Sequence, residues 1–162
     1  MKALPNLFFA ALVFLTLSCS IDDDDMAPEN LYGTWENSSL HEEAGLSIVN
    51  AYVFHENGTF EHKMTARQPN SSAEVGYNSV ISGTFELSGN KLTLEETNWL
   101  SLPENSQSWH VSLDELVNVE WNRERNATLT LKDRKSQLEM DFGPCGPNAL
   151  CAGPAIYFRV WR

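Results

Sequence analysis

Between residues 31 and 161, short runs in which every second residue is apolar alternate with stretches of turn-forming residues. A period of two places successive side chains on opposite faces of a strand, so each run is predicted to be a β-strand with one buried face. The turns recur about every eight to twelve residues, a spacing typical of antiparallel sandwiches and barrels. No run has the period of an amphipathic helix, so the sequence predicts an all-β fold.

Two hairpins have a register that their apolar residues determine. At residues 48–66, a three-residue loop pairs Phe54 with Phe60, whereas a two-residue Asn-Gly loop would place Phe54 opposite Glu61. We predict the three-residue loop, because it gathers the apolar side chains on one face. At residues 79–96, a two-residue turn pairs Phe85 with Leu94, so both strands bury the same face.

Other segments are assigned from weaker patterns. Residues 67–78 are polar and are predicted to form a long loop, and residues 122–126 a turn. Residues 109–116 are compatible with a strand or a helical turn. The last strand, residues 155–161, is expected to turn Ile156, Phe158 and Val160 to the buried face that holds Leu138 and Met140.

The links between neighbouring strands are mostly short enough for hairpins, which favours an up-and-down meander over a Greek key. A meander of eight to ten strands can close on itself and so remove both sheet edges. We therefore predict an all-β, antiparallel up-and-down meander of eight to ten strands closed into a barrel. Closure would pair the strand of Trp35 with the strand of Trp161.

The N-terminal part of the chain has the pattern of a leader and a tether. Residues 7–17 form an apolar run after Lys2 that is too short to cross a bilayer, so residues 1–18 read as a secretory signal. Four consecutive aspartates at 22–25 repel one another, and residues 19–30 are predicted to be a solvated tether. A weak calcium site in this run is the alternative. The barrel domain is assigned to residues 31–162.

Charge and motif content exclude several functions. The net charge of −11 argues against a nucleic-acid partner, since phosphate binding needs clusters of Lys and Arg. We expect no metal or cofactor, because zinc needs several converging ligands and only His62 is expected to face inward. We also expect no enzyme, because the nucleophile-elbow motif and a triad signature are absent. Glu95 and Glu96 are assigned to a solvated strand edge.

Cys145 and Cys151 lie in a Gly- and Pro-rich link before the last strand. If Cys19 is lipidated, they form an even pair in an oxidising compartment, and a structural disulfide is expected. It would close a small ring, worth about 2 kcal/mol in the chain-entropy picture. A metal site or a redox switch is the alternative; the nearest histidine in sequence is His110, and redox pairs usually have a tighter spacing beside a helix.

Residues 15–19, Leu-Thr-Leu-Ser-Cys, resemble the lipobox of bacterial lipoproteins, whose cysteine receives lipid after cleavage before it. The match is good at Ser18 and Cys19 and departs at Thr16, where the family usually has leucine. The resemblance implies lipidation of Cys19 and a membrane anchor. The acidic run that follows resembles the export signal of surface lipoproteins in Gram-negative bacteria. The implied location is the outer membrane or the cell surface.

Gly33 and Trp35 match the Gly-x-Trp signature that opens the first strand of lipocalins, and residues 54–60, 82–94 and 157–160 are similar to segments of lipocalin-like bacterial lipoproteins. The resemblance covers residues 31–162 and implies a small barrel with an apolar interior. It implies that Trp35 is the barrel floor and that Arg159, or else Arg162, packs over its ring in a cation–π contact. The Thr-Asp-Tyr motif of typical lipocalins is absent, so transport of a specific lipid is not implied.

The leading hypothesis is a monomeric, membrane-anchored barrel that binds a small hydrophobic or amphipathic molecule in its interior. The expected cavity wall consists of Tyr52, Phe54, Phe60, His62, Met64, Phe85 and Met140. Trp99, beside a proline, is expected at the cavity mouth. The alternative is a structural or interaction module, such as an envelope accessory or an inhibitor, with a filled barrel that works through its surface. Internal volume separates the two, because eight strands allow either.

Overall fold

The computed structural model describes residues 26–144 and 153–161. Within them the chain forms one short helix, α1 (Pro28–Leu31), and two 3-10 turns, η1 (Glu42–Ala44) and η2 (Leu113–Glu115). The strands are β1 (Gly33–His41), β2 (Leu46–Phe54), β3 (Thr59–Arg67), β4 (Glu74–Ser88), β5 (Lys91–Ser101), β6 (Val117–Val119), β7 (Arg123–Lys132), β8 (Gln137–Asp141) and β9 (Ala155–Val160). No helix in this part of the chain is long and apolar enough to span a bilayer.

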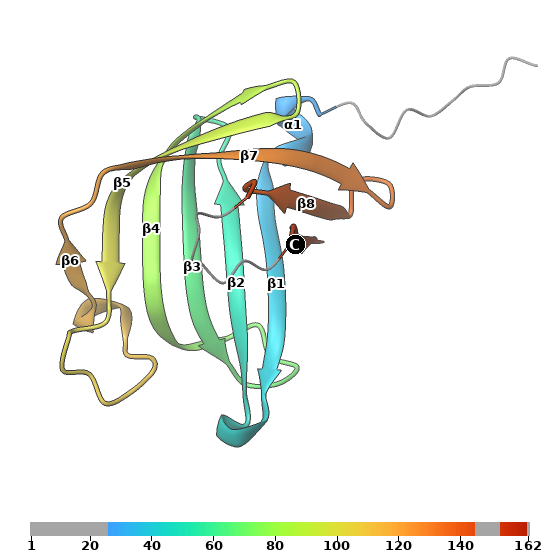
Figure 1. Ribbon diagram of the computed structural model, residues 1–162. Helices are drawn as coiled ribbons and strands as arrows, with labels where there is room; N and C mark the ends of the chain where they lie inside the picture. Colours follow the sequence, from blue (N-terminus) through green and yellow to red (C-terminus); the bar gives the residue numbers. More distant parts are fainter. Residues whose placement is uncertain (1–25, 145–152, 162) are drawn as a thin grey trace, which may run out of the picture.

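Eight of these strands form a closed antiparallel barrel (Figure 1). The order around it is β1, β2, β3, β4, β5, β7, β8 and β9, and β9 returns to pair with β1. The predicted all-β meander and its closure are therefore confirmed. At the closing seam Trp35 lies opposite Arg159, which joins the two ends of the domain through one ladder.

The barrel is closed only over the half that adjoins α1. β9 pairs with β1 at residues 34–36, and β7 pairs with β5 at residues 91–96. Farther along β5, the short strand β6 takes the place of β7 at residues 99–101. Among the described residues, positions 37–41 of β1 have only β2 as a ladder partner. We call the covered end the α1 end. The opposite or distal end carries residues 42–45, 68–73 and 102–112.

Both predicted hairpin registers are confirmed. Phe54 lies opposite Phe60 across a loop in which Gly58 has a φ of 80°. Phe85 lies opposite Leu94 across the turn that follows Ser88. In each case the register that gathers the apolar side chains inside the barrel is the one that forms, because a slip by one residue would turn them to solvent.

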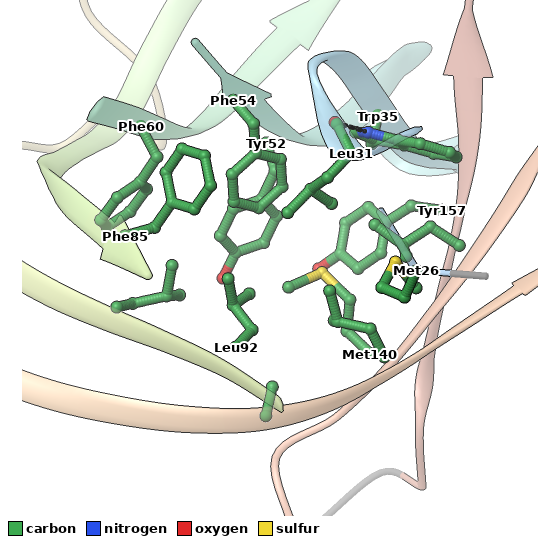
Figure 2. Packing of buried hydrophobic residues seen from close by; sticks show 14 of the residues in the cluster. Met26, Leu31, Trp35, Tyr52, Phe54, Phe60, Phe85, Leu92, Met140 and Tyr157 are labelled. Atoms are coloured by element: carbon green, nitrogen blue, oxygen red, sulfur yellow. Dashed lines mark hydrogen bonds between the residues drawn. The ribbon is translucent and has the colours of Figure 1, made fainter. Parts of the chain in front are cut away.

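A hydrophobic cluster fills the α1 half of the barrel, and Figure 2 shows 14 of its residues converging, ten of them labelled. α1 covers this cluster, since Leu31 is fully buried and its carbonyl accepts a 2.7 Å hydrogen bond from Trp35 Nε1. Met26 is also buried in the cluster. The predicted boundary at residue 31 is therefore too late: residues 26–30, assigned to the tether, belong to the fold because they cover the barrel end.

The last strand faces the opposite way from the prediction. Tyr157 points into the core, whereas Phe158 is 57 % exposed and Ile156 is 38 % exposed. The seam explains the difference: pairing of Arg159 with Trp35 turns the odd-numbered residues of β9 inward.

Two segments expected to be loops or turns are partly strand. β4 already begins at Glu74, where Arg67 bonds both Glu74 and Glu36 across the outer face, at 3.4 and 2.9 Å. β7 begins at Arg123, inside the segment assigned to a turn. The ambiguous segment 109–116 contains one bridge, between Val111 and Tyr77, followed by η2. Charged side chains on the outer face allow such polar stretches to pair as strands.

Candidate ligand cavity at the distal end

Five of the seven predicted wall residues are packed against one another rather than around a space. The five are Tyr52, Phe54, Phe60, Phe85 and Met140, and each belongs to the hydrophobic cluster of the α1 half. The Tyr52 ring lies 5.7 Å from that of Phe54 and 5.4 Å from that of Tyr157, and Phe54 meets Phe85 edge to face at 5.1 Å (Figure 2). Aromatic pairs at these separations are well-packed core contacts. The α1 half is thus filled by its own side chains.

Trp35 and Arg159 have the arrangement that the lipocalin resemblance implies. The Arg159 guanidinium lies 4.3 Å from the centre of the Trp35 ring. Arg159 also donates to the backbone carbonyls of Tyr32 and Asn30, so it ties β9 to α1. Gly33 has a φ of 114°, and a Cβ built on it would lie 3.7 Å from Arg159 Nη1. The floor of the barrel is therefore a packed plug at the α1 end.

His62 and Met64 lie on the inward face of β3, beyond the filled cluster, and both are only partly buried. The His62 ring stacks on Tyr52 with its centre 4.2 Å away and the two planes 6° apart. Burial, and secondarily the positive charge of Arg125, lowers the pKa of His62 to about 4. The imidazole is therefore neutral at neutral pH and serves as a flat stacking partner.

His62 should make stability depend on pH. The unfolded imidazole takes up a proton below pH 6.5 and the folded one only below about pH 4, so the unfolded state binds more protons in this window and stability falls as pH falls. The largest slope from one such group is about 1.4 kcal/mol per pH unit. In His62→Phe, which keeps the stack and removes the titration, the free energy of unfolding should fall less steeply between pH 6.5 and 4. Equal slopes in denaturant titrations of the two proteins would contradict this assignment.

A buried ion pair joins the neighbouring strands β5 and β7 on the inner face of the barrel, next to the filled cluster. Glu96 is 1 % exposed, and its carboxylate accepts bonds from Arg125 Nη1 at 3.1 Å and Trp121 Nε1 at 3.0 Å. The Arg125 guanidinium also lies 4.0 Å from the centre of the Phe142 ring. Glu96 was assigned to a solvated strand edge, and that assignment is wrong. The pair places two opposite charges inside the barrel, where no charged side chain was expected.

The distal end holds a largely apolar cavity of about 360 Å³. One side is the tip of the β1–β2 hairpin and the other is the segment of residues 107–110. Its lining residues are His41, Ala44, Leu46, Ile48, Gln107, Ser108, Trp109 and His110. His41, Leu46 and Ile48 share the inward face of β1 and β2 with Trp35 and Tyr52, so the cavity continues the interior of the barrel.

The segment of residues 107–110, which forms the second side of this cavity, is fixed to β4. Tyr77 and Val111 exchange two backbone hydrogen bonds, at 2.7 and 3.0 Å, and Asn78 Nδ2 donates to the carbonyl of Trp109 at 2.8 Å. Gly76 allows the close approach, because a Cβ there would lie 2.4 Å from Cδ2 of His110. These contacts hold the aromatic rings of the segment in place on the far wall.

In comparisons with known proteins, no family model, no curated protein and no solved structure matched the chain. The functional reading therefore rests on the cavity itself. Among the described residues, no group of three or more His, Cys, Asp or Glu side chains is placed to hold a metal ion. The chemistry available at the distal end is apolar contact, ring stacking and hydrogen bonding to two imidazoles.

The cavity residues were not predicted as a site. Trp99 was expected at a cavity mouth, but it does not line this cavity and packs edge to face on Trp121 at 4.7 Å. Trp109 takes that place instead, 39 % exposed. His41 and His110 could have pointed to the site. Both flank polar turns, and the order of strands in the meander places these turns at the same end of the barrel. Cys19, Cys145 and Cys151 lie outside the described residues, so lipidation and the disulfide stay predictions.

Proposed function

We propose that this chain is a lipid-anchored β-barrel that binds a small hydrophobic or amphipathic molecule in the cavity at its distal end. The observation that carries the proposal is the apolar space of about 360 Å³ between the β1–β2 tip and residues 107–110. Small-molecule sites usually occupy roughly 300–1,000 Å³ and combine apolar walls with a few polar groups. The cavity meets both conditions, whereas the α1 half is filled.

The lining favours a molecule with one apolar and one polar part. Leu46, Ile48 and Trp109 supply aliphatic and aromatic surface, and an indole face is a strong stacking partner. His41 and His110 supply imidazole nitrogens that can donate or accept a hydrogen bond. A short acyl chain or a flat hydrocarbon with a hydroxyl group would satisfy all five side chains.

The proposed anchor is lipid on Cys19. It is supported by the lipobox-like residues 15–19, by the leader before them and by the acidic run after them. Several acyl chains on one cysteine would hold the protein stably, since one chain gives only reversible binding. The proposed location is the outer membrane or the cell surface, with the barrel outside the bilayer as a monomer.

Ligand binding is tested by a fluorescence titration of the purified protein with a panel of fatty acids and sterol-like amphiphiles. We expect a saturable change in tryptophan emission for at least one class. In Trp109→Ala the affinity should fall about tenfold or more, which corresponds to about 1.4 kcal/mol or more of lost contact. Trp161→Ala, which changes an exposed tryptophan outside the cavity, is the matched control and should bind as the parent does. No saturable change across the panel, or equal losses in both variants, would contradict the proposal.

A second candidate function follows from the filled α1 half. A barrel whose centre is packed from Trp35 to Phe85 can act through its outer surface alone, as an envelope accessory or an inhibitor. Native mass spectrometry of protein taken from its own membrane separates the candidates. A retained small molecule supports binding at the distal end, and a protein that carries none and fails the titration supports the surface role.

A further inference from the structure

Cationic side chains gather at the α1 end of the barrel, although the chain carries a net charge of −11. Lys91 follows the β4–β5 turn, Arg134 and Lys135 lie in the β7–β8 turn, and Arg159 packs beside α1. The turns of the distal end are acidic instead. They carry Glu42, Glu43 and Glu104. The α1 end also carries the acidic side chains of Glu29, Glu56 and Asp133, so it holds both signs of charge, whereas the described turns of the distal end carry no Lys or Arg.

The β7–β8 turn presents its cations in a constrained conformation. Asp133, Arg134 and Lys135 have φ values of 49°, 55° and 66°, a region that residues with side chains rarely adopt. The turn is held against α1, since Lys135 Nζ donates to Asn30 Oδ1 at 3.2 Å and Arg159 Nε to the Lys135 carbonyl at 3.2 Å. Arg134, at the tip, is exposed. Such backbone persists only where the surrounding structure maintains it, so the presentation of Arg134 is built into the fold.

Two large aromatic side chains are exposed on or just after β9, and one of them lies beside Arg159. Trp161 is 73 % exposed and lies 5.1 Å from the Arg159 guanidinium, measured to the ring centre. Phe158 is 57 % exposed on the outer face of the same strand. Exposed tryptophan beside Lys and Arg is the composition of surfaces that settle at the lipid–water interface. Anionic headgroups complement the cations.

The length of the tether agrees with this orientation. Six residues separate Cys19 from Met26, where the described fold begins at the α1 end. A fully extended chain of that length reaches about 25 Å at most. β4 alone, with its 15 residues, extends about 50 Å along its own direction. A lipid on Cys19 therefore brings the α1 end to the bilayer.

We infer that the α1 end is a docking surface for an anionic lipid bilayer, with Trp161 in the headgroup region and Arg134 against lipid phosphates. This inference rests on the lipid anchor of the proposed function. Docking in this orientation turns the distal cavity away from the membrane. The cavity is then open to molecules arriving from solution rather than from the lipid phase.

The test uses the acylated protein purified from its own membrane and reconstituted into vesicles of phosphatidylglycerol and phosphatidylethanolamine with brominated acyl chains. Bromine quenches tryptophans that reach the interface. We expect quenching that is lost in Trp161→Phe and kept in Trp109→Phe, the matched change at the distal end. Arg134→Glu should lose the same quenching, and Arg123→Glu, which changes an exposed arginine in β7 away from the turn, should keep it.

Quenching that persists in Trp161→Phe, or that is unchanged in Arg134→Glu, would overturn the docking. The docking would also be overturned if quenching arose only after the aspartates at 22–25 were replaced by asparagine. That result would mean that these aspartates, and not lipid phosphates, pair with the cations in the parent protein. The intact mass of the protein shows whether it is acylated, and so distinguishes failure of the docking from failure of the proposed anchor. An acylated protein without Trp161 quenching overturns the docking alone. A protein without acyl chains that still floats with phosphatidylglycerol vesicles through Trp161 overturns the anchor alone, and one that does not float overturns both.

Discussion

Replacing Glu96 by alanine is expected to lower the free energy of unfolding by about 3 kcal/mol, measured by denaturant titration. Removing one partner of a buried ion pair usually costs about 3–5 kcal/mol, because the other charge remains without compensation. The lower end applies here, since the Arg125 side chain keeps 24 % exposure and can recover some hydration. Trp121 Nε1 would lose its acceptor at the same time.

Two companion variants make this result specific. Glu95→Ala changes the neighbouring carboxylate, which is exposed, and should shift stability by no more than about 0.5 kcal/mol. A double change, Glu96→Leu with Arg125→Met, removes both charges and should recover most of the loss, because apolar replacements of buried pairs are often neutral or stabilising. If Glu96→Ala were as stable as Glu95→Ala, the interior pair would not exist as described.

Replacing Gly83 by alanine should be at least as damaging. A Cβ at Gly83 would lie 1.8 Å from the carbonyl oxygen of Glu95 and 2.9 Å from its carbonyl carbon, both backbone atoms. The register of β4 and β5 shifts at this point, where Gly83 faces Glu96 and Ser82 faces Asn98. Relief of the clash requires the two strands to separate. The expected loss is about 3 kcal/mol, the upper end of the range for overpacked sites, or failure to fold.

Gly153→Ala is the control for this prediction, because nothing lies within 4 Å of a Cβ built there. Its unfolding midpoint should equal that of the parent protein. Circular dichroism distinguishes a folded but weakened Gly83→Ala protein from an unfolded one. A Gly83→Ala protein with the parent's midpoint would show that β4 and β5 do not approach as closely as the bulge implies.

The fold was largely predictable because two independent constraints agreed at each hairpin. At residues 54–60 the alternation of apolar residues and the geometry of a loop with a left-handed Gly58 both selected the pairing of Phe54 with Phe60. The last strand had no such second constraint. Its outward face, with Ile156 and Phe158, is as apolar as its inward face, and only the long-range seam with Trp35 decides between them.

The candidate site was harder to predict, for two physical reasons. Alternation along β5 carries Leu92 and Leu94 inward and reaches Glu96 with the same parity, but a carboxylate is stable inside only if a partner arrives from elsewhere. That partner, Arg125, comes from β7. The alternation also shows only which side chains face the interior, and not whether space for a ligand remains between them. Tyr52 and Phe60 do face inward, and their neighbours fill the space that a ligand would need.

The distal cavity depends on contacts between distant parts of the chain. Residues 107–110 have no periodic pattern, and their position follows from Gly76 and Asn78 on β4. Gly76, a glycine without a turn assignment, was a local signal that another segment approaches closely there. Sequence spacing alone could not show that another loop would use it.

Because the ring of strands is incomplete at the distal end, the part of the barrel that determines global stability differs from the part that surrounds the cavity. Since β7 and β9 join their neighbours only near the Trp35 end, cooperative unfolding is governed there, whereas the walls formed by residues 37–41 and 99–101 can open as a smaller unit at lower free-energy cost. If the distal cavity binds a ligand as proposed, the ligand would enter and leave without disturbing the tightly packed half. Under the same proposal, substitutions that line the distal cavity would change which ligand binds and leave the thermal stability unchanged.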